Sequence, residues 1–175
     1  MLICGLNQYY DPYKPHVQRF VTWEYDISGN LLHTNVINTE YRANYSTGLL
    51  QLADGNYFIT GSCANQYGWQ RNGLIKVDSK GNLIWSKMYE HGGGGVEPYI
   101  VTGFPNPDGS CLLLLSDDRG VGFLQINSNG EVIRHIPCRG YPYGMTVKQL
   151  DTNKSFYVNS YGEIVFVNLD GYLSR

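Results

Sequence analysis

Asn72-Gly-Leu-Ile-Lys-Val-Asp-Ser-Lys-Gly-Asn-Leu-Ile-Trp-Ser-Lys-Met-Tyr89 is the stretch that decides the fold of this chain. Two apolar runs suited to β-strands flank Asp78-Ser-Lys-Gly81, which has the residues of a tight turn. An aspartate at the first turn position can accept hydrogen bonds from the backbone two residues on. A glycine at the fourth position accepts a positive φ, which closes a hairpin with a bulge. The stretch therefore predicts strand, turn and strand.

Similar turns recur along the chain, at intervals of about 40 to 50 residues, which is the spacing of propeller blades. The four copies are Asp26–Gly29, Asp78–Gly81, Asn127–Gly130 and Asn168–Gly171. A second hairpin precedes the last three of them, at Asp54-Gly55, Asp108-Gly109 and Asp151-Thr-Asn153. Each repeat is therefore predicted to hold four short antiparallel strands, here termed A to D.

This register predicts an all-β chain, with residues 1–175 forming one β-propeller domain of about four antiparallel four-stranded blades. The blades are expected at approximately 1–40, 45–90, 96–138 and 144–175. The first is incomplete, because it opens on Met1–Gly5 with no A strand before it. The last is also incomplete, because its D strand is only Tyr172–Arg175.

Composition agrees with this architecture and excludes several classes of protein. The 175 residues include 21 glycines and 15 tyrosines, and the formal net charge is −2. Such a weak charge gives no electrostatic reason to expect nucleic acid. No apolar stretch approaches the roughly 20 residues of a membrane span. The first residues lack the pattern of a signal peptide and fall inside a predicted strand. An excised piece of a longer protein would have the same start, and the sequence leaves open whether this chain is such a piece.

The four cysteines do not predict a disulfide framework. Cys4, Cys63 and Cys111 lie on B strands of different repeats, and Cys138 lies near the end of a D strand. Equivalent strands of neighbouring blades are about 10 Å apart, too far for a disulfide. We expect free, buried thiols, which leaves a cytoplasmic location open. The sequence has no C-x-x-C pair and no histidine at ligand spacing, so neither a metal nor a cofactor is predicted.

The segment from about Gly48 to Leu115 resembles the repeat of bacterial PQQ-like β-propeller proteins. The resemblance rests on the hairpin at 74–89, the four glycines at 92–95, and Asn106-Pro-Asp-Gly-Ser-Cys-Leu-Leu-Leu114. Trp85 has no counterpart in the other repeats, where His33 and Arg134 take its place. The resemblance implies a fold, without catalytic residues, and a secreted or cell-surface location. Four blades are too few for the rings that hold a quinone cofactor.

Aromatic residues gather in one set of predicted loops. The B–C loops are expected at Asn7–His16, Asn65–Arg71 and Asp117–Arg119, and the D–A loops at Tyr41–Tyr45, Glu90–Tyr99 and Arg139–Tyr143. In a propeller these loops share one face, opposite the short A–B and C–D turns. Loops of a rigid scaffold commonly carry function, and Tyr, Trp and Arg anchor interfaces. The candidate binding residues are Tyr10, Tyr13, His16, Tyr67, Trp69, Arg71, His91, Glu97, Asp118, Arg119, Arg139 and Tyr141.

The favoured hypothesis is a non-catalytic scaffold that binds a glycan, a peptide or a partner protein through this face, without membrane insertion. A lectin-like propeller is one alternative, and packing of the tyrosines between blades is another. The enzyme alternative is a lyase or hydrolase at the mouth of the central channel, where His16 or His91 could act with Glu97 or Asp118. A half-ring would expose sheet edges, so a protein partner or self-association is expected to complete the propeller.

Overall fold

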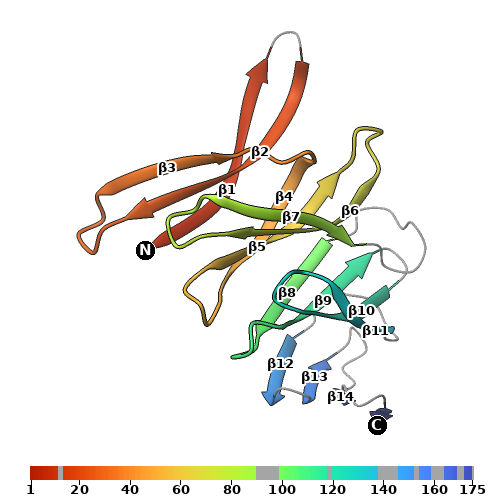
Figure 1. The fold of residues 1–175 in the computed structure, drawn as a ribbon. Coiled ribbons are helices and arrows are strands. Elements are labelled where there is room, and N and C mark those ends of the chain that lie inside the picture. Colours follow the sequence, from red (N-terminus) through yellow and green to blue (C-terminus); the bar gives the residue numbers. More distant parts are fainter. Residues whose placement is uncertain are drawn as a thin grey trace.

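The computed structural model describes residues 1–11, 14–89, 99–117, 120–137, 146–151, 154–158, 164–168 and 172–174. These residues form fifteen strands in four antiparallel sheets, and the described part of the chain contains no helix (Figure 1). The predicted all-β class is confirmed. Each sheet is a meander, in which strands adjacent in sequence are adjacent in the sheet.

The first sheet has three strands and each of the others has four. The first contains β1 (Leu2–Asp11), β2 (Lys14–Tyr25) and β3 (Leu31–Ile37). The second contains β4 (Arg42–Gln51), β5 (Tyr57–Ala64), β6 (Gln70–Val77) and β7 (Leu83–Tyr89). The third contains β8 (Tyr99–Pro105), β9 (Cys111–Asp117), β10 (Gly120–Ile126) and β11 (Val132–Pro137). The fourth contains β12 (Thr146–Asp151), β13 (Lys154–Val158), β14 (Ile164–Asn168) and β15 (Tyr172–Ser174).

Two of the predicted aromatic loops are strand instead. Most of Asn7–His16 belongs to β1 and β2, where Tyr9 pairs with Val17 and Asp11 with Lys14. In Figure 1 this hairpin extends past the rest of its sheet. Likewise β4 begins at Arg42, inside the predicted loop Tyr41–Tyr45. Both predictions were wrong for the same reason, because antiparallel pairing continues wherever the neighbouring strand offers free backbone groups.

Six turns share one backbone conformation. In each, the first residue and the fifth are joined by a backbone hydrogen bond, and the glycine at position four donates to the first residue. The glycines have φ between 72° and 86°, and are Gly29, Gly55, Gly68, Gly81, Gly109 and Gly130. Gly68 belongs to the turn Asn65–Trp69. The predicted B–C loop Asn65–Arg71 is therefore a five-residue turn of the same kind as the other five. The asparagine at position one and the glycine at position four are the sequence pattern that indicates this turn.

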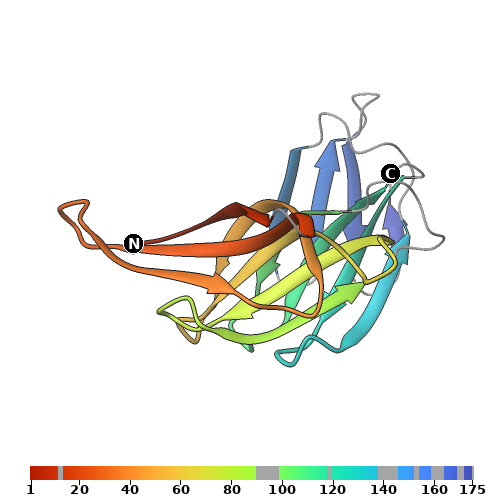
Figure 2. The ribbon, with the colours of Figure 1, turned by 90° about the horizontal axis from the view of Figure 1, so that it is seen from above.

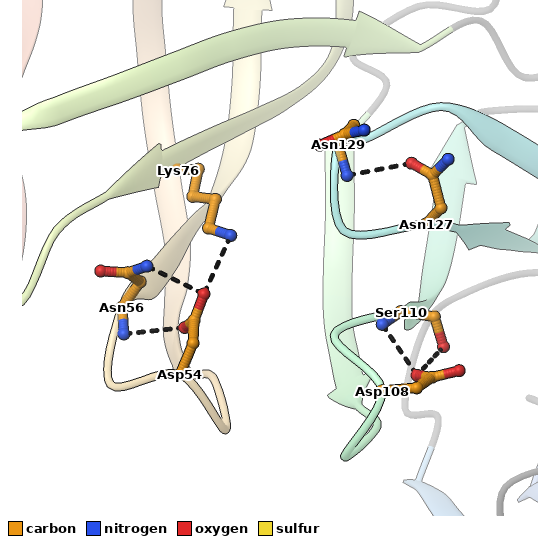
Figure 3. Close-up of polar contacts among 7 residues, drawn as sticks. All are labelled: Asp54, Asn56, Lys76, Asp108, Ser110, Asn127 and Asn129. Atoms are coloured by element: carbon orange, nitrogen blue, oxygen red, sulfur yellow. Dashed lines mark hydrogen bonds and ion pairs between the residues drawn. The ribbon is translucent and has the colours of Figure 1, made fainter.

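Side-chain acceptors stabilise the turns (Figure 3). Asn127 Oδ1 accepts from the Asn129 backbone N–H at 3.0 Å, as Asp78 Oδ1 does from Lys80 at 2.8 Å. In the β4–β5 and β8–β9 turns the side-chain acceptor is instead the residue at position three. There Asp108 Oδ1 accepts from both the backbone N–H and the hydroxyl of Ser110.

Asp54 is the acceptor at position three of the β4–β5 turn, and it also forms an ion pair. It accepts from the backbone N–H of Asn56 at 3.0 Å and from Lys76 Nζ at 3.2 Å. The Lys76 side chain is largely buried and its ammonium lies 5.9 Å from the Phe58 ring centroid. The ion pair therefore connects the β4–β5 turn to the end of β6 (Figure 3).

These turn aspartates predict that stability falls in acid. The side-chain hydrogen bond from Asn30 holds the pKa of Asp26 below its ordinary 3.8, and Ser110 does the same for the pKa of Asp108. A carboxyl group whose folded-state pKa is depressed stabilises the fold fully above the ordinary pKa, and this contribution is lost as pH falls through the folded-state pKa. We expect the urea midpoint to fall as pH drops below about 4. Asp26→Asn should make that fall shallower, since asparagine serves at the same position in Asn127; an unchanged pH profile would contradict the assignment.

The core lies between successive sheets. Ile59, Ile75 and Val77 of the second sheet pack with Phe20 and Ile37 of the first. The opposite face of the same strands carries Phe58 and Leu74, which pack with the third sheet. Alternate residues of β5 and β6 thus serve two different cores, as expected for strands buried on both faces.

The third sheet carries a further core on its other face, made of Leu112, Leu114, Val121 and Phe123. The fourth sheet lies on that side of the third in both ribbon views (Figures 1 and 2). The sheets are therefore stacked in chain order, each next to the one that precedes it.

Equivalent turns reach from one sheet to the sheet before it. In the second sheet, the carbonyl of Lys80 accepts from Asn35 Nδ2 at 2.7 Å. In the third sheet, the carbonyl of Asn129, at the same turn position, accepts from Lys87 Nζ at 2.6 Å. Asn35 and Lys87 also hold equivalent positions. Asn35 pairs with Thr22 and Lys87 pairs with Leu74, and each pair is the same number of residues from the turn of its own sheet. We call such a contact a docked turn.

The described cysteines are free thiols on β1, β5 and β9, as predicted for Cys4, Cys63 and Cys111. Burial raises the pKa of Cys63 and of Cys111 to about 12, so neither forms a thiolate near neutral pH. Cys138 lies outside the described residues. Cys63 and Cys111 are buried in the core as predicted, whereas Cys4 is only half-buried.

Candidate functional site

The described candidate residues that come together are Tyr67, Trp69 and Arg71, at the turn between β5 and β6. Asn65 Oδ1 accepts from the backbone N–H of Tyr67 at 2.9 Å and of Trp69 at 3.0 Å. Gly68, with φ of 81°, allows the chain to reverse between the two aromatic residues. The turn is therefore held in one conformation by its own first residue.

The three side chains form what we call the aromatic platform. Tyr67 and Trp69 are 74% and 60% exposed, and their ring centroids are 6.4 Å apart. Arg71 Cζ lies 5.8 Å from the Trp69 ring centroid, and its guanidinium donates to the Gln70 carbonyl at 2.7 Å. The platform thus combines apolar ring area with a positioned cation.

Further tyrosines lie at the same end of the sheets. Tyr45 and Tyr99, near the starts of β4 and β8, make an edge-to-face contact with centroids 5.6 Å apart. Tyr45 pairs with Ser62, just before the platform turn. A side-chain hydrogen bond with Glu40, together with partial burial, raises the pKa of Tyr41 to about 12. Tyr41 therefore stays protonated at physiological pH.

Two buried acceptors also lie near this end. Gln70 Oε1 and Asn72 Oδ1, both on β6, have no hydrogen-bond partner among the described residues. Acceptors of this kind are commonly satisfied by ordered water. The Asn72 amide itself donates to the Tyr89 carbonyl at 3.3 Å.

The other sequence-predicted candidates are placed only in part. Tyr10 is on β1 and His16 on β2, within the paired hairpin, and nothing of their side chains is described. The rest lie outside the described residues: Tyr13, His91, Glu97, Asp118, Arg119, Arg139 and Tyr141. Tyr45 and Tyr99 were missed as candidates; their signal was an aromatic residue near the start of each A strand.

The described side chains give no sign of a metal centre. No group of three His, Cys, Asp or Glu residues among them is arranged to hold a metal ion. Over the same ranges, no helix has the length and apolar character to cross a membrane. His33 on β3 and His135 on β11 are exposed on the last strands of their sheets.

No family model matches the sequence, and no curated protein matches it. The chain is similar in structure to a crystal structure, at 1.35 Å resolution, of a protein of unknown function from Bacteroides caccae. The TM-score is 0.57 at 11% sequence identity, and the match covers 98% of this chain and 56% of that chain. At this identity the likeness concerns the fold alone. The chain spans little more than half the length of the protein that it matches.

Proposed function

We propose that this protein is a non-catalytic β-propeller scaffold that binds a ligand or partner protein through its aromatic platform. The propeller arrangement is supported by four meander sheets stacked in chain order and by docked turns that repeat between them. A radial stack of such sheets would repeat one contact from sheet to sheet.

The observation that carries the binding proposal is the exposure of Tyr67 and Trp69 on a turn held in place by Asn65. Two large aromatic rings on a preorganised turn lose little conformational entropy on binding. Their faces suit the apolar faces of sugar rings or the side chains of a peptide. Arg71 adds donors for hydroxyl or carboxylate groups beside the Trp69 ring.

Substitution of Trp69 tests this proposal. Purified protein is screened on oligosaccharide and peptide arrays, and affinities for the bound spots are then measured in solution. We expect Trp69→Ala to weaken binding at least about tenfold, since loss of an interface anchor costs 1.4 kcal/mol or more. Arg71→Ala should weaken the binding of acidic or hydroxyl-rich ligands in particular.

Ile84→Ala is the matched control, because Ile84 is also an exposed apolar residue but lies on β7. It should leave binding unchanged. Trp69→Ala and Ile84→Ala both replace exposed side chains, so their urea midpoints should stay close to that of the unmodified protein. Equal affinities for all three variants and the parent would exclude the platform as the binding surface.

A further inference from the structure

The outward face of the first sheet differs from the equivalent faces of the next two. The strand register shows which residues are equivalent in different sheets. Ile3 pairs with Trp23 and Ile59 pairs with Ile75, and Trp23 and Ile75 are equally far along the chain from their turns, so Ile3 and Ile59 hold the same repeat position. Leu113 holds the same position in the third sheet, opposite Leu124. Ile59 and Leu113 are fully buried against the preceding sheet, whereas Ile3 is 40% exposed. Val36, on the same outward face, is 45% exposed.

The equivalent turns of the first three sheets also differ. Those at Asp78–Gly81 and Asn127–Gly130 contact the preceding sheet, whereas the one at Asp26–Gly29 contacts no other sheet in the described part of the chain. A Cβ on Gly81 would lie 2.2 Å from Thr22 Oγ1, and one on Gly130 would lie 2.7 Å from Trp85. A Cβ on Gly29, at the same turn position, would meet nothing within 4 Å, although its φ of 84° matches theirs. Val21 shares this face and is buried, but among the described residues no other sheet covers Ile3, Val36 or the Gly29 turn.

The occupant that fits this face is another sheet of the same repeat. In both internal examples the receiving surface is one face of the preceding sheet, which has three strands in the first case and four in the second. The far side of the fourth sheet is the corresponding surface at the other end of the chain. Its strand β14 reads Ile-Val-Phe-Val before Asn168, and an apolar residue at each of four successive positions is typical of a strand buried on both faces.

We propose that two copies of this chain associate through these surfaces, the first sheet of each packing on the fourth sheet of the other. This rests on the propeller arrangement proposed above. Two-fold symmetry forms both contacts at once and closes the assembly. Propellers of 4 to 8 blades are typical, and two copies of four sheets reach the upper number. The four sheets also match only 56% of the longer chain from Bacteroides caccae, so the similar protein has room for further sheets of its own.

The test is the mass of the native protein at micromolar concentration, by light scattering and native mass spectrometry. We expect twice the 19.8 kDa of one chain. The double variant Ile3→Lys/Val36→Lys should be monomeric, because lysines would be buried without partners in the contact. Each single variant, Ile3→Lys or Val36→Lys, should weaken the dimer at least tenfold. Both side chains are already 40% or more exposed in the single chain, so the urea midpoint of the monomeric double variant should show a folded protein.

Ile133→Lys is the matched control, because Ile133 is an exposed isoleucine on β11 of the third sheet, which contributes neither proposed surface. It should remain dimeric, as should Trp69→Ala, so failure of the dimer and failure of ligand binding are distinguishable. A monomeric parent protein would overturn the proposal. A dimer that survives the double lysine substitution in a folded protein would overturn it as well.

Discussion

Replacing Gly61 by alanine is expected to lower the free energy of unfolding by about 3 kcal/mol or more, the upper range for overpacking. Gly61 lies in β5 where β4 crosses most closely. A Cβ there would stand 2.1 Å from the carbonyl oxygen of Tyr45 and 3.0 Å from the Cα of Ser46. These are backbone atoms of a paired strand, so they cannot move aside without breaking the ladder between β4 and β5.

Gly48→Ala is the control for that prediction. Gly48 lies on β4 beside the same irregularity in register, between Ser46 and Gly48. Its added Cβ would come 3.3 Å from Thr60 Oγ1, a side-chain atom that can yield. We expect a cost below about 1 kcal/mol, measured as a shift of the urea midpoint at constant slope. Equal shifts for the two variants would show that the close approach of β4 does not constrain residue 61.

Gly81→Ala is expected to destabilise the protein more than Gly29→Ala does, by about 1 to 3 kcal/mol. Both glycines have a positive φ, 86° and 84°, so alanine costs a similar amount of backbone strain in each. Only at Gly81 does the new methyl group collide with Thr22 of the preceding sheet. It would also disturb the hydrogen bonds that the Gly81 and Lys80 carbonyls accept from Thr22 and Asn35.

The measurement is equilibrium unfolding in urea of both single variants and of Thr22→Ala with and without Gly81→Ala. All are made in the monomeric Ile3→Lys/Val36→Lys background, so that the Gly29 turn does not dock on a second copy. Removing the Thr22 hydroxyl and methyl should relieve part of the collision, so the double variant should be more stable than the sum of the single effects predicts. If Gly29→Ala and Gly81→Ala were equally destabilising, the docked turn would contribute nothing between the sheets. Additive effects of the Thr22 and Gly81 substitutions would lead to the same conclusion.

Turn chemistry made the all-β class predictable. Aspartate or asparagine at position one and glycine at position four set the turns at Asp26, Asp78 and Asn127, and the positive φ of Gly29, Gly81 and Gly130 confirms them. These signals are local, because a side-chain acceptor and a missing Cβ act within five residues. The same local reading applied to Asn65–Trp69 would have found a tight turn where a long loop was predicted.

Strand ends were less predictable, because pairing depends on the neighbouring strand rather than on the residues themselves. The hairpin that extends to Asp11 and Lys14, and the start of β4 at Arg42, were both predicted as loops. The aromatic platform was predictable in part and in part depends on strand pairing. Its residues were named from the sequence, but the contact of Arg71 with Trp69 follows from where β6 begins.

By itself, the sequence determined that this chain is all-β, where its described tight turns fall, and which aromatic residues are exposed at the β5–β6 turn. Only the tertiary structure decided which equivalent positions are buried. Ile3 and Ile59 are the same residue at the same repeat position, yet one is 40% exposed and the other fully buried. The difference comes from the sheet that packs against one and not the other, because burial is a property of the neighbour and not of the residue.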